Sequence, residues 1–297
     1  MQSHSREIAT PPAEVRNAAV AGKFYPASPR VLQQTVDDLL AQPRLENSPQ
    51  ELLAVLAPHA GYMYSGSVAA HAYKHLQGRT PQAVVVIAPS HFQRFPFISL
   101  FGGRAYVTPL GEIPVAQNLM QELLQSEPCF VSSWRGHEAR GARAEHALEV
   151  QLPFLQRALP HCALLPIIMG EPSWELCEAL ARQLAVLARK HALLFIASSD
   201  LSHYHSAGEA QALDQHCLDL LLAGESKKLH EAFASRACEA CGAGPIITTM
   251  LATQMLGANQ TDLLCYDHSG TVSGDFDYVV GYAAVSFSRV NDHAYPE

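Results

Sequence analysis

The sequence is 297 residues long, with 48% hydrophobic and 16% charged residues. An average soluble domain carries about 25% charged residues, so much of this chain must be buried, which excludes a disordered chain or a coiled coil as the main architecture. Subtracting 28 acidic from 20 basic residues gives a net charge of −8. Because no run of Lys and Arg forms a positive stripe, nucleic acid is not expected as a partner.

The composition also bears on the compartment. The longest apolar stretches, such as residues 83–88 and 192–197, are far shorter than the roughly 20 residues that span a bilayer, so we expect no membrane helix. The first 16 residues are polar and lack the apolar segment of a secretory signal. Seven cysteines, an odd number that lies mostly in apolar runs, indicate buried thiols in a reducing compartment. We therefore expect a cytoplasmic protein.

Hydrophobic patterns predict the elements in chain order. Short apolar runs without polar alternation predict buried central strands. These runs are residues 52–57, 83–88, 162–169 and 192–197. Helical patterns occupy residues 67–76, 115–124, 146–158, 174–190, 210–222 and 245–256. Strands at 262–266 and 278–288 follow with only turns between them, and 97–101 with 104–107 predict a short hairpin around Gly102 and Gly103.

The alternation of strands and helices favours α/β layers around a mixed sheet. No repeat divides the chain, so we expect one domain over residues 16–290. The remaining residues, 1–15 and 291–297, are interpreted as tails, of which the first is expected to be flexible.

Three of the predicted strands end in the same way, with an apolar run, small or turn-forming residues and then a histidine. The segments are AVLAPHAGY with His59, VVVIAPSHF with His91, and LFIASSDLSHYH with Asp200, His203 and His205. Side chains that follow parallel strands converge beyond the carboxyl edge of a sheet, where open α/β sheets bind ligands. These histidines are therefore expected to meet in one pocket.

Cys241, in CEACGAGPIITTML, stands directly before a glycine-rich turn and a predicted helix, for which Pro245 suits the first position. A helix N-terminus lowers the pKa of a thiol, which makes its sulfur a metal ligand or a nucleophile. Together, His59, His91 and Cys241 predict a metal site with open coordination positions. Imidazole and thiolate ligands suit Fe(II), Cu or Zn better than Mg or Ca.

Four further residues are candidates for the same pocket. His203 is three residues from Asp200, which suits it as an acid or base beside the metal, with Asp200 orienting a ligand or water. Glu145 and His146 open a predicted helix in RAEHALEVQLPFL and are expected to add a carboxylate and another imidazole.

Other motifs have a functional and a packing interpretation. Tyr62 and Tyr64, in HAGYMYSG, either line the pocket or pack over the sheet. His71 and His75 have the spacing of a helical metal pair, but the Glu of the H-E-x-x-H motif is missing, which favours an ordinary helix face. Cys238 completes a CxxC without a second one, so it is interpreted as a buried or spare thiol.

Eight motifs in this chain resemble, in the same order, those of the Memo family. They are RNAAVAGKFYP, APHAGYMYSG, IAPSHF, TPLGEIPV, AEHALEVQLPFL, SSDLSHY, ACGAGPI and SGDFDYVVGYAA. The resemblance runs from residue 16 to residue 287, and the bacterial members are called AmmeMemoRadiSam system protein B. It implies a three-layer α/β/α sandwich around a mixed, largely parallel sheet, similar to class III extradiol (LigB-type) dioxygenases, which are non-heme iron enzymes.

The resemblance also implies roles for individual residues. In Memo proteins, the residues that match His59, His91 and Cys241 form the metal site, and those that match Asp200 and His203 line the same pocket. The animal relative is described as a redox-active protein that binds iron or copper, and also as an effector that recognises a phosphotyrosine peptide. The dioxygenases use a carboxylate as third ligand. A thiolate is itself oxidisable, so ring cleavage is not carried over to this chain.

The leading hypothesis is a mononuclear metal-dependent oxidoreductase-like protein that holds Fe(II), with Cu or Zn as the other metals. One alternative is a non-catalytic module that binds a peptide or phosphopeptide in the same pocket. Another is a zinc-assisted hydrolase with His203 or Asp200 as base. The expected partner is an unknown small molecule or peptide. We do not expect an association with a membrane. The family name further implies an association with an AMMECR1-like protein and a radical SAM protein.

Overall fold

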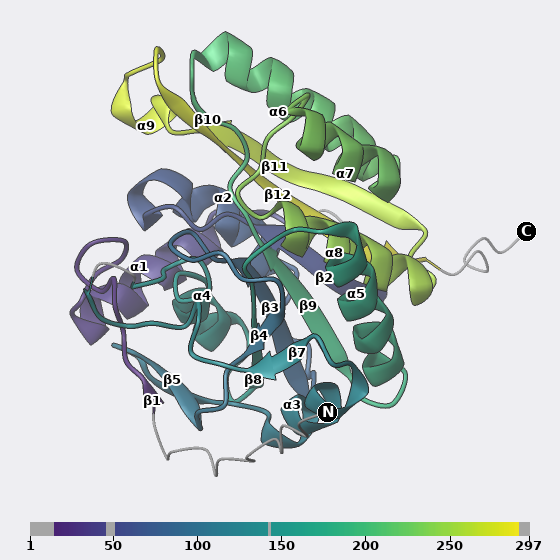
Figure 1. Cartoon of the computed structure of the whole chain (residues 1–297). Helices are drawn as coiled ribbons and strands as arrows, with labels where there is room; N and C mark the ends of the chain where they lie inside the picture. The colour runs from purple at the N-terminus through teal and green to yellow at the C-terminus, as the bar shows by residue number, and fades with distance from the viewer. Residues whose placement is uncertain (1–14, 46–50, 142–143, 291–297) are drawn as a thin grey trace, which may run out of the picture.

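The computed structural model describes residues 15–45, 51–141 and 144–290 (Figure 1). Most of the predicted N-terminal tail and the whole predicted C-terminal tail lie outside these residues. Residue 15 already belongs to a short strand, β1 (Val15–Arg16). Among the described helices, not one combines the length and the apolar composition needed to cross a membrane.

A nine-stranded mixed sheet forms the centre of the protein, in the order β10-β12-β2-β9-β3-β8-β4-β7, with β11 also paired to β12. Its strands are β2 (Glu51–Ala57), β3 (Ala83–Pro89), β4 (Ile98–Leu100), β7 (Phe130–Ser132), β8 (Ala163–Met169), β9 (Leu193–Ser198), β10 (His203–His205), β11 (Gln260–His268) and β12 (Val279–Arg289). The central strands β2, β9, β3 and β8 are parallel to one another. β12 and β4 run antiparallel beside them. The predicted mixed, largely parallel sheet is therefore confirmed.

Helices cover both faces of this sheet, because its central strands are apolar on both sides. In β2, Val55 and Ala57 pack into one buried cluster, and Ala54 and Leu56 into a second. The first cluster contains α1 (Pro29–Ala41), α2 (Tyr62–Lys74) and α4 (Gln151–Ala158). The second contains α3 (Gln117–Ser126), α5 (Trp174–Ala188), α6 (Ala207–Leu222), α7 (Ser226–Ser235) and α8 (Ala243–Met255). The result is the expected three-layer sandwich, with α1 and α4 at the left of Figure 1 and α5 and α8 at the right.

The sequence patterns located the central strands to within one residue at each end but missed the two longer helices α1 and α7, as well as the short α9 (Gly270–Ser273). α1 starts at a proline that follows Ser28, a sequence that favours a helix N-terminus.

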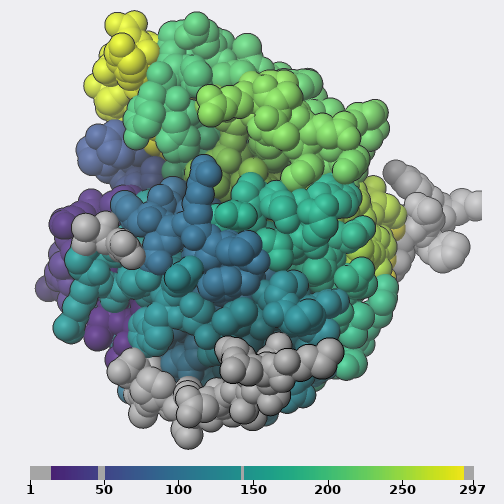
Figure 2. Space-filling model, viewed as in Figure 1, coloured from purple at the N-terminus to yellow at the C-terminus, as the bar shows by residue number. Residues whose placement is uncertain are grey.

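In the space-filling view, α6 and α7 lie in green at the top of the molecule, above the blue and teal surface of earlier segments (Figure 2).

The predicted hairpin of residues 97–101 and 104–107 is wrong. β4 extends the central sheet by pairing with β8 and β7. The next strand belongs instead to a separate three-stranded sheet of β1, β5 (Ala105–Thr108) and β6 (Gly111–Pro114). Ile98 and Leu100 are fully buried, so long-range burial outweighs the local turn signal of the two glycines. A hairpin does join β5 to β6. Its turn ends at Gly111, whose φ of +115° favours glycine.

The helix predicted for residues 146–158 begins five residues later, at the start of α4. Oε1 of Glu145 accepts hydrogen bonds from the backbone N–H groups of His146 and Ala147, at 2.8 and 3.0 Å. The carboxylate thus provides acceptors for these two N–H groups outside a helix. The chain then passes through turns before α4 starts. Glu145 and His146 therefore lie in a loop, and do not open a helix.

Two smaller corrections concern the C-terminal third. α8 begins at Ala243, so Pro245 is its third residue and not its first. The segment between β11 and β12, predicted to contain only turns, holds the four-residue helix α9 (Gly270–Ser273). The first difference is a shift of less than one helical turn, and the second is a single helical turn in a segment that contains Gly270 and Gly274.

A buried guanidinium fixes the N-terminal segment. Arg16 is 1% exposed and forms an ion pair with Glu149. It also donates from Nε to the carbonyl oxygen of His137, at 3.3 Å, and from a terminal nitrogen to the carbonyl oxygen of Glu145. The Glu149 carboxylate accepts further hydrogen bonds from the N–H groups of residues 19 and 20 and from the hydroxyl of Tyr25. Such a buried pair persists only when its remaining hydrogen-bonding groups are satisfied.

Replacing Arg16 with Met is expected to lower the free energy of unfolding by about 3–5 kcal/mol, because Glu149 would remain buried without its counter-charge. Urea denaturation followed by circular dichroism measures this loss. Arg104→Met is the matched control, since the side chains of Arg104 and Glu112 are 53% and 47% exposed and water screens such a pair, which therefore adds little to stability. Equal losses in the two variants would contradict the importance of the buried pair.

Candidate metal centre

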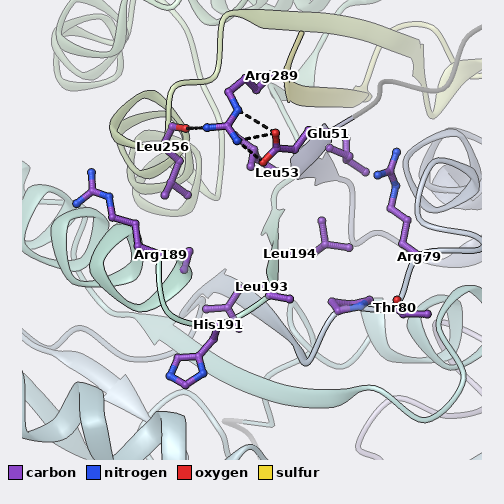
Figure 3. Close-up of a pocket in the computed structure, with 14 residues that line it drawn as sticks. Glu51, Leu53, Arg79, Thr80, Arg189, His191, Leu193, Leu194, Leu256 and Arg289 are labelled. Carbon is purple, nitrogen blue, oxygen red and sulfur yellow. Dashed lines mark hydrogen bonds and ion pairs between the residues drawn. The ribbon is translucent and has the colours of Figure 1, made fainter. Parts of the chain in front are cut away.

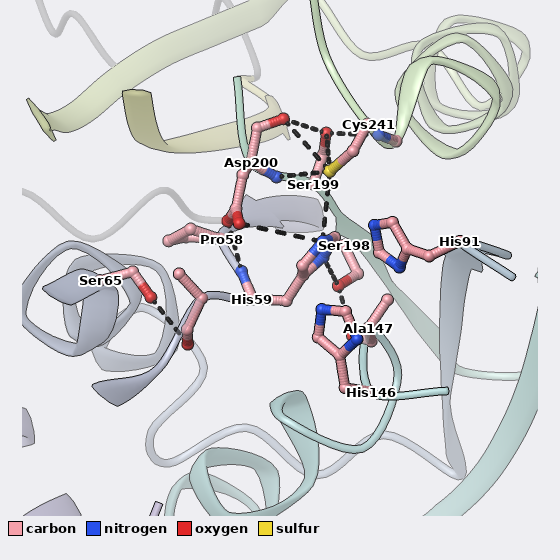
Figure 4. A network of polar contacts seen from close by, with 12 residues as sticks. Pro58, His59, Ser65, His91, His146, Ala147, Ser198, Ser199, Asp200 and Cys241 are labelled. Atoms are coloured by element: carbon pink, nitrogen blue, oxygen red, sulfur yellow. Dashed lines mark hydrogen bonds and ion pairs between the residues drawn. The ribbon is translucent and has the colours of Figure 1, made fainter. Parts of the chain in front are cut away.

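Titratable side chains from four separate segments meet beyond the carboxyl ends of the parallel strands (Figure 4). His59 follows β2, His91 follows β3 and Asp200 follows β9, whereas Cys241 precedes α8. The ligand atoms of His59, Asp200 and Cys241 lie within 4.8 Å of one another, and so do those of His59, His91 and His146. The two groups share His59, which stands at the centre of the site.

His59 is 1% exposed and is held on three sides. Its backbone N–H donates to Oδ1 of Asp200 at 2.7 Å, and its ring Nδ1 lies 2.9 Å from Oγ of Ser198. The other ring nitrogen, Nε2, lies 3.2 Å from Sγ of Cys241. Nε2 and the sulfur are thus placed side by side, as two ligands of one metal ion would be.

His91 is positioned by a carboxylate. Its backbone N–H donates to Oε2 of Glu145 at 2.6 Å, and its Nδ1 lies 2.9 Å from Oε1. Since an ionised carboxylate only accepts, Nδ1 carries a proton and Nε2 is left for the pocket. Burial alone would lower the pKa of His91, but its hydrogen bonds to Cys241 and Glu145 raise it to about 10. Burial would raise the pKa of Glu145, but the same His91 contact lowers it to about 2.

His146 stacks on the ring of His91, with 4.6 Å between ring centroids and 14° between planes. The ring of Phe24 also lies 4.6 Å from that of His146, and Nδ1 of His146 is 3.3 Å from Oε1 of Glu145. Burial, with a smaller contribution from the charge of His59, lowers the pKa of His146 to about 3. His146 is therefore neutral near pH 7, the form in which an imidazole binds a metal.

The sulfur of Cys241 accepts a hydrogen bond from the backbone N–H of Asp200 at 3.2 Å. Burial would raise the pKa of this thiol, but the charge of His59 and hydrogen bonds with His59 and His91 lower it to about 6. The next residue must be glycine, because a Cβ on Gly242 would lie 2.4 Å from the carbonyl oxygen of Ser198. The thiolate form of Cys241 is therefore stabilised by the neighbouring imidazoles. The argument from sequence considered only the helix N-terminus and did not include this cause.

Asp200 and His203 occupy different positions. Asp200 is buried beside His59, and burial raises the pKa of its carboxyl group to about 6. His203 lies in β10, half-buried and outside both ligand groups, with its Nδ1 2.8 Å from the carbonyl oxygen of Leu201. Because a carbonyl only accepts, Nδ1 of His203 carries a proton. His205, from the same strand, pairs with Glu239 at 3.0 Å.

Tyr62 packs in the core, in agreement with the packing interpretation. It is 6% exposed, its hydroxyl donates to the carbonyl oxygen of Val150 at 2.8 Å, and its ring lies 4.9 Å from that of Phe154. Tyr64, two residues further along α2, is 36% exposed. Neither tyrosine is among the described residues that line the cleft beside the candidate metal ligands.

A cleft of about 860 Å³ opens onto this site. Its lining includes His91 and Cys241, together with the half-exposed side chain of Phe92 and His230 of α7. Sites for small molecules in proteins usually have volumes of about 300–1,000 Å³, so a small organic molecule fits here.

A second cavity, of about 400 Å³, lies at the opposite edge of the sheet (Figure 3). It is formed around the first residues of β2 and β9, among them Leu53 and Leu193. At its rim, Arg289 forms an ion pair with Glu51 at 2.6 Å. β2 is seven residues long, so this cavity is roughly 20 Å from the candidate metal ligands and is separate from them.

Two residues that hold the site were missed at the sequence level, Ser198 and Gln151. Ser198 ends β9 and contacts His59, while Gln151 starts α4 and donates to Oγ of Ser198 at 2.8 Å. Each of them is a polar residue inside an apolar pattern, which was the signal that could have identified them from the sequence. Both side chains are almost completely buried, and a buried polar group needs a hydrogen-bond partner.

The fold and this site together define an α/β protein with a His/Asp/Cys cluster, able to hold a metal ion, at the carboxyl edge of its sheet. The chain belongs to the Memo-like protein family, whose model matches residues 16–286. A MEMO1 family protein of Methanosarcina mazei is 38% identical, over 92% of this chain and 98% of its own. Another, from Methanopyrus kandleri, is 33% identical over 92% and 99%.

A solved structure, uncharacterized protein JW3007 from Escherichia coli K12, is similar in fold, with a TM-score of 0.50. The similarity covers 79% of this chain and 99% of that one, at 15% sequence identity. At this identity the comparison supports the shared α/β architecture.

The lowered pKa of Cys241 leads to a pH prediction. In the metal-free protein, alkylation of Cys241 by iodoacetamide should reach half its maximal rate near pH 6, because the thiolate is the reacting form. Mass spectrometry after labelling from pH 5 to 9 measures this rate. Cys129, also half-buried but with its pKa raised by burial, is the control and should react only at higher pH. Identical pH profiles for the two cysteines would contradict the prediction.

Proposed function

We propose that this protein binds one redox-active metal ion, iron in the first place and copper in the second, through His59, His91 and Cys241. On this proposal it acts as an oxidoreductase-like protein related to the extradiol dioxygenases. The observation that carries the proposal is the placement of Nε2 of His59 3.2 Å from a sulfur whose pKa is lowered to about 6. An imidazole nitrogen and a sulfur that face one another can both bind a metal ion, which would displace the proton that they share.

The donor set fits such a metal. His59 and His91 each have Nδ1 engaged by a fixed partner, which leaves Nε2 as the ligand atom. His146 and Asp200 are the adjacent groups in the same cluster, and they suit a fourth ligand or a contact to a bound molecule. Three protein ligands leave coordination positions open, as a catalytic site requires.

A metal held there would supply Lewis acidity and one-electron chemistry to a molecule in the cleft. The chain's own residues would orient that molecule and move protons. We assign proton transfer to Nε2 of His203, because its Nδ1 is fixed on the carbonyl oxygen of Leu201. We assign to Asp200, beside it, the role of orienting a ligand or a water molecule. Phe92, in the wall of the cleft, would limit access of water.

We also propose a cytoplasmic location and an association with an AMMECR1-like protein and a radical SAM protein. The location is supported by seven free cysteines, which fit a reducing compartment. The association is supported by the family resemblance.

The first test is the metal content of protein purified without oxygen and without added metal. Iron or copper should approach one atom per chain in the wild type and should be lost in His59→Ala and Cys241→Ala. Elemental analysis by mass spectrometry measures it. His71→Ala is the matched control, because His71 is half-buried in α2 and bonds to the carbonyl oxygen of Ser67 away from the cluster. His203→Ala should also keep the metal.

The other outcomes decide between the alternatives. Zinc at one atom per chain, with hydrolysis of a model ester, would replace the redox proposal with a zinc-assisted hydrolase. Protein that holds no metal after reconstitution, yet binds a peptide or phosphopeptide in the same cleft, would replace it with a non-catalytic binding module.

A further inference from the structure

A chain of buried hydrogen bonds runs from α2 to the ring of His59. The hydroxyl of Tyr73 donates to Oε1 of Gln151 at 2.8 Å, and Nε2 of Gln151 donates to Oγ of Ser198 at 2.8 Å. Oγ of Ser198 then lies 2.9 Å from Nδ1 of His59 (Figure 4). All four side chains are at most 1% exposed, so water does not complete any of these bonds.

Backbone carbonyls fix the direction of every bond in this chain. Nε2 of Gln151 faces the carbonyl oxygens of Ala57 and Pro58, at 3.2 and 3.0 Å. A carbonyl only accepts, so this end of the amide must be the NH2 group, whose two protons are shared among the two carbonyl oxygens and Oγ of Ser198. The opposite amide orientation would place Oε1 against two other oxygens.

The proton of Ser198 is assigned in the same way. Its Oγ lies 2.7 Å from the carbonyl oxygen of Ala147, which can only accept. The single hydroxyl proton is therefore donated to Ala147, and the oxygen accepts from Gln151. No proton is left on Ser198 for His59, so Nδ1 of His59 must be the donor.

We propose that Ser198 and Gln151 are positioning residues that keep a proton on Nδ1 of His59 and so present Nε2 as the metal-binding atom. The inference rests on the proposed function for its consequence at the metal, but the tautomer itself does not require a metal. Ser198 has no free acceptor or donor beyond these contacts. His59 consequently cannot pass its Nδ1 proton along the chain and acts as a fixed ligand.

The two histidine ligands then differ in a defined way. His91 donates to the Glu145 carboxylate, whereas His59 donates to a neutral hydroxyl. A charged acceptor makes an imidazole more basic, so His91 is the stronger electron donor of the two and His59 the weaker. Removing the hydroxyl should therefore affect the geometry of His59 more than the charge of the site.

The experiment uses full-length protein with 15N-labelled histidine. In metal-free wild type, the nitrogen signals missing from His59→Gln identify His59, and Nδ1 should carry a proton. In Ser198→Ala, that proton should no longer be confined to Nδ1, and the affinity for Fe(II) should fall about 10- to 100-fold, the usual effect of losing such a partner. Ser198→Thr, which keeps the hydroxyl, should retain the wild-type tautomer.

Ser286→Ala is the matched control. Ser286 lies in β12 at 1% exposure and its hydroxyl has no hydrogen-bond partner among the described residues, so its loss should change neither the tautomer nor the affinity. An unprotonated Nδ1 in wild-type His59 overturns the proposal without recourse to any variant. An unchanged tautomer and Fe(II) affinity in folded Ser198→Ala overturns it as well. Absence of Fe(II) binding with the expected tautomer would refute the proposed function and leave the positioning intact.

Discussion

The structure depends on the need to satisfy a fully buried guanidinium. Arg16 donates to Glu149 and to the carbonyl oxygens of His137 and Glu145, and these acceptors belong to one loop, which follows β7 and precedes α4. A charge without water must be met by fixed acceptors, so the N-terminal segment and this loop hold each other in place. The same loop carries Glu145 and His146 into the candidate metal centre. The geometry of the ligands is thus tied to the first strand of the fold.

The centre itself follows from hydrogen-bond acceptors that cannot change role. The Glu145 carboxylate directs His91, and the carbonyl oxygen of Ala147 directs Ser198, which in turn directs His59. Both imidazoles present Nε2 to one space that also holds the sulfur of Cys241. Since each ring is fixed from behind, the metal binding that we propose would need little reorganisation of the two side chains.

Prediction from sequence worked where a local pattern was sufficient. The central strands were located because both of their faces are buried, and His59, His91 and Asp200 followed from their positions at strand ends. It failed for the hairpin around residues 102–103, because β4 finds its partners β8 and β7 far along the chain. Burial in a sheet that already exists outweighs a favourable turn, and no local pattern reports it.

The sequence by itself determined the α/β architecture, the family motifs and the residue types that converge at the carboxyl edge, because apolar periodicity and strand polarity are local properties. Only the tertiary structure decided which groups act together. It placed His146 against His91, and it left His203 outside the ligand groups. It also connected Gln151 to Ser198 across the core. These relations join residues that are distant in sequence, and they arise because buried polar atoms must find partners wherever the fold brings them.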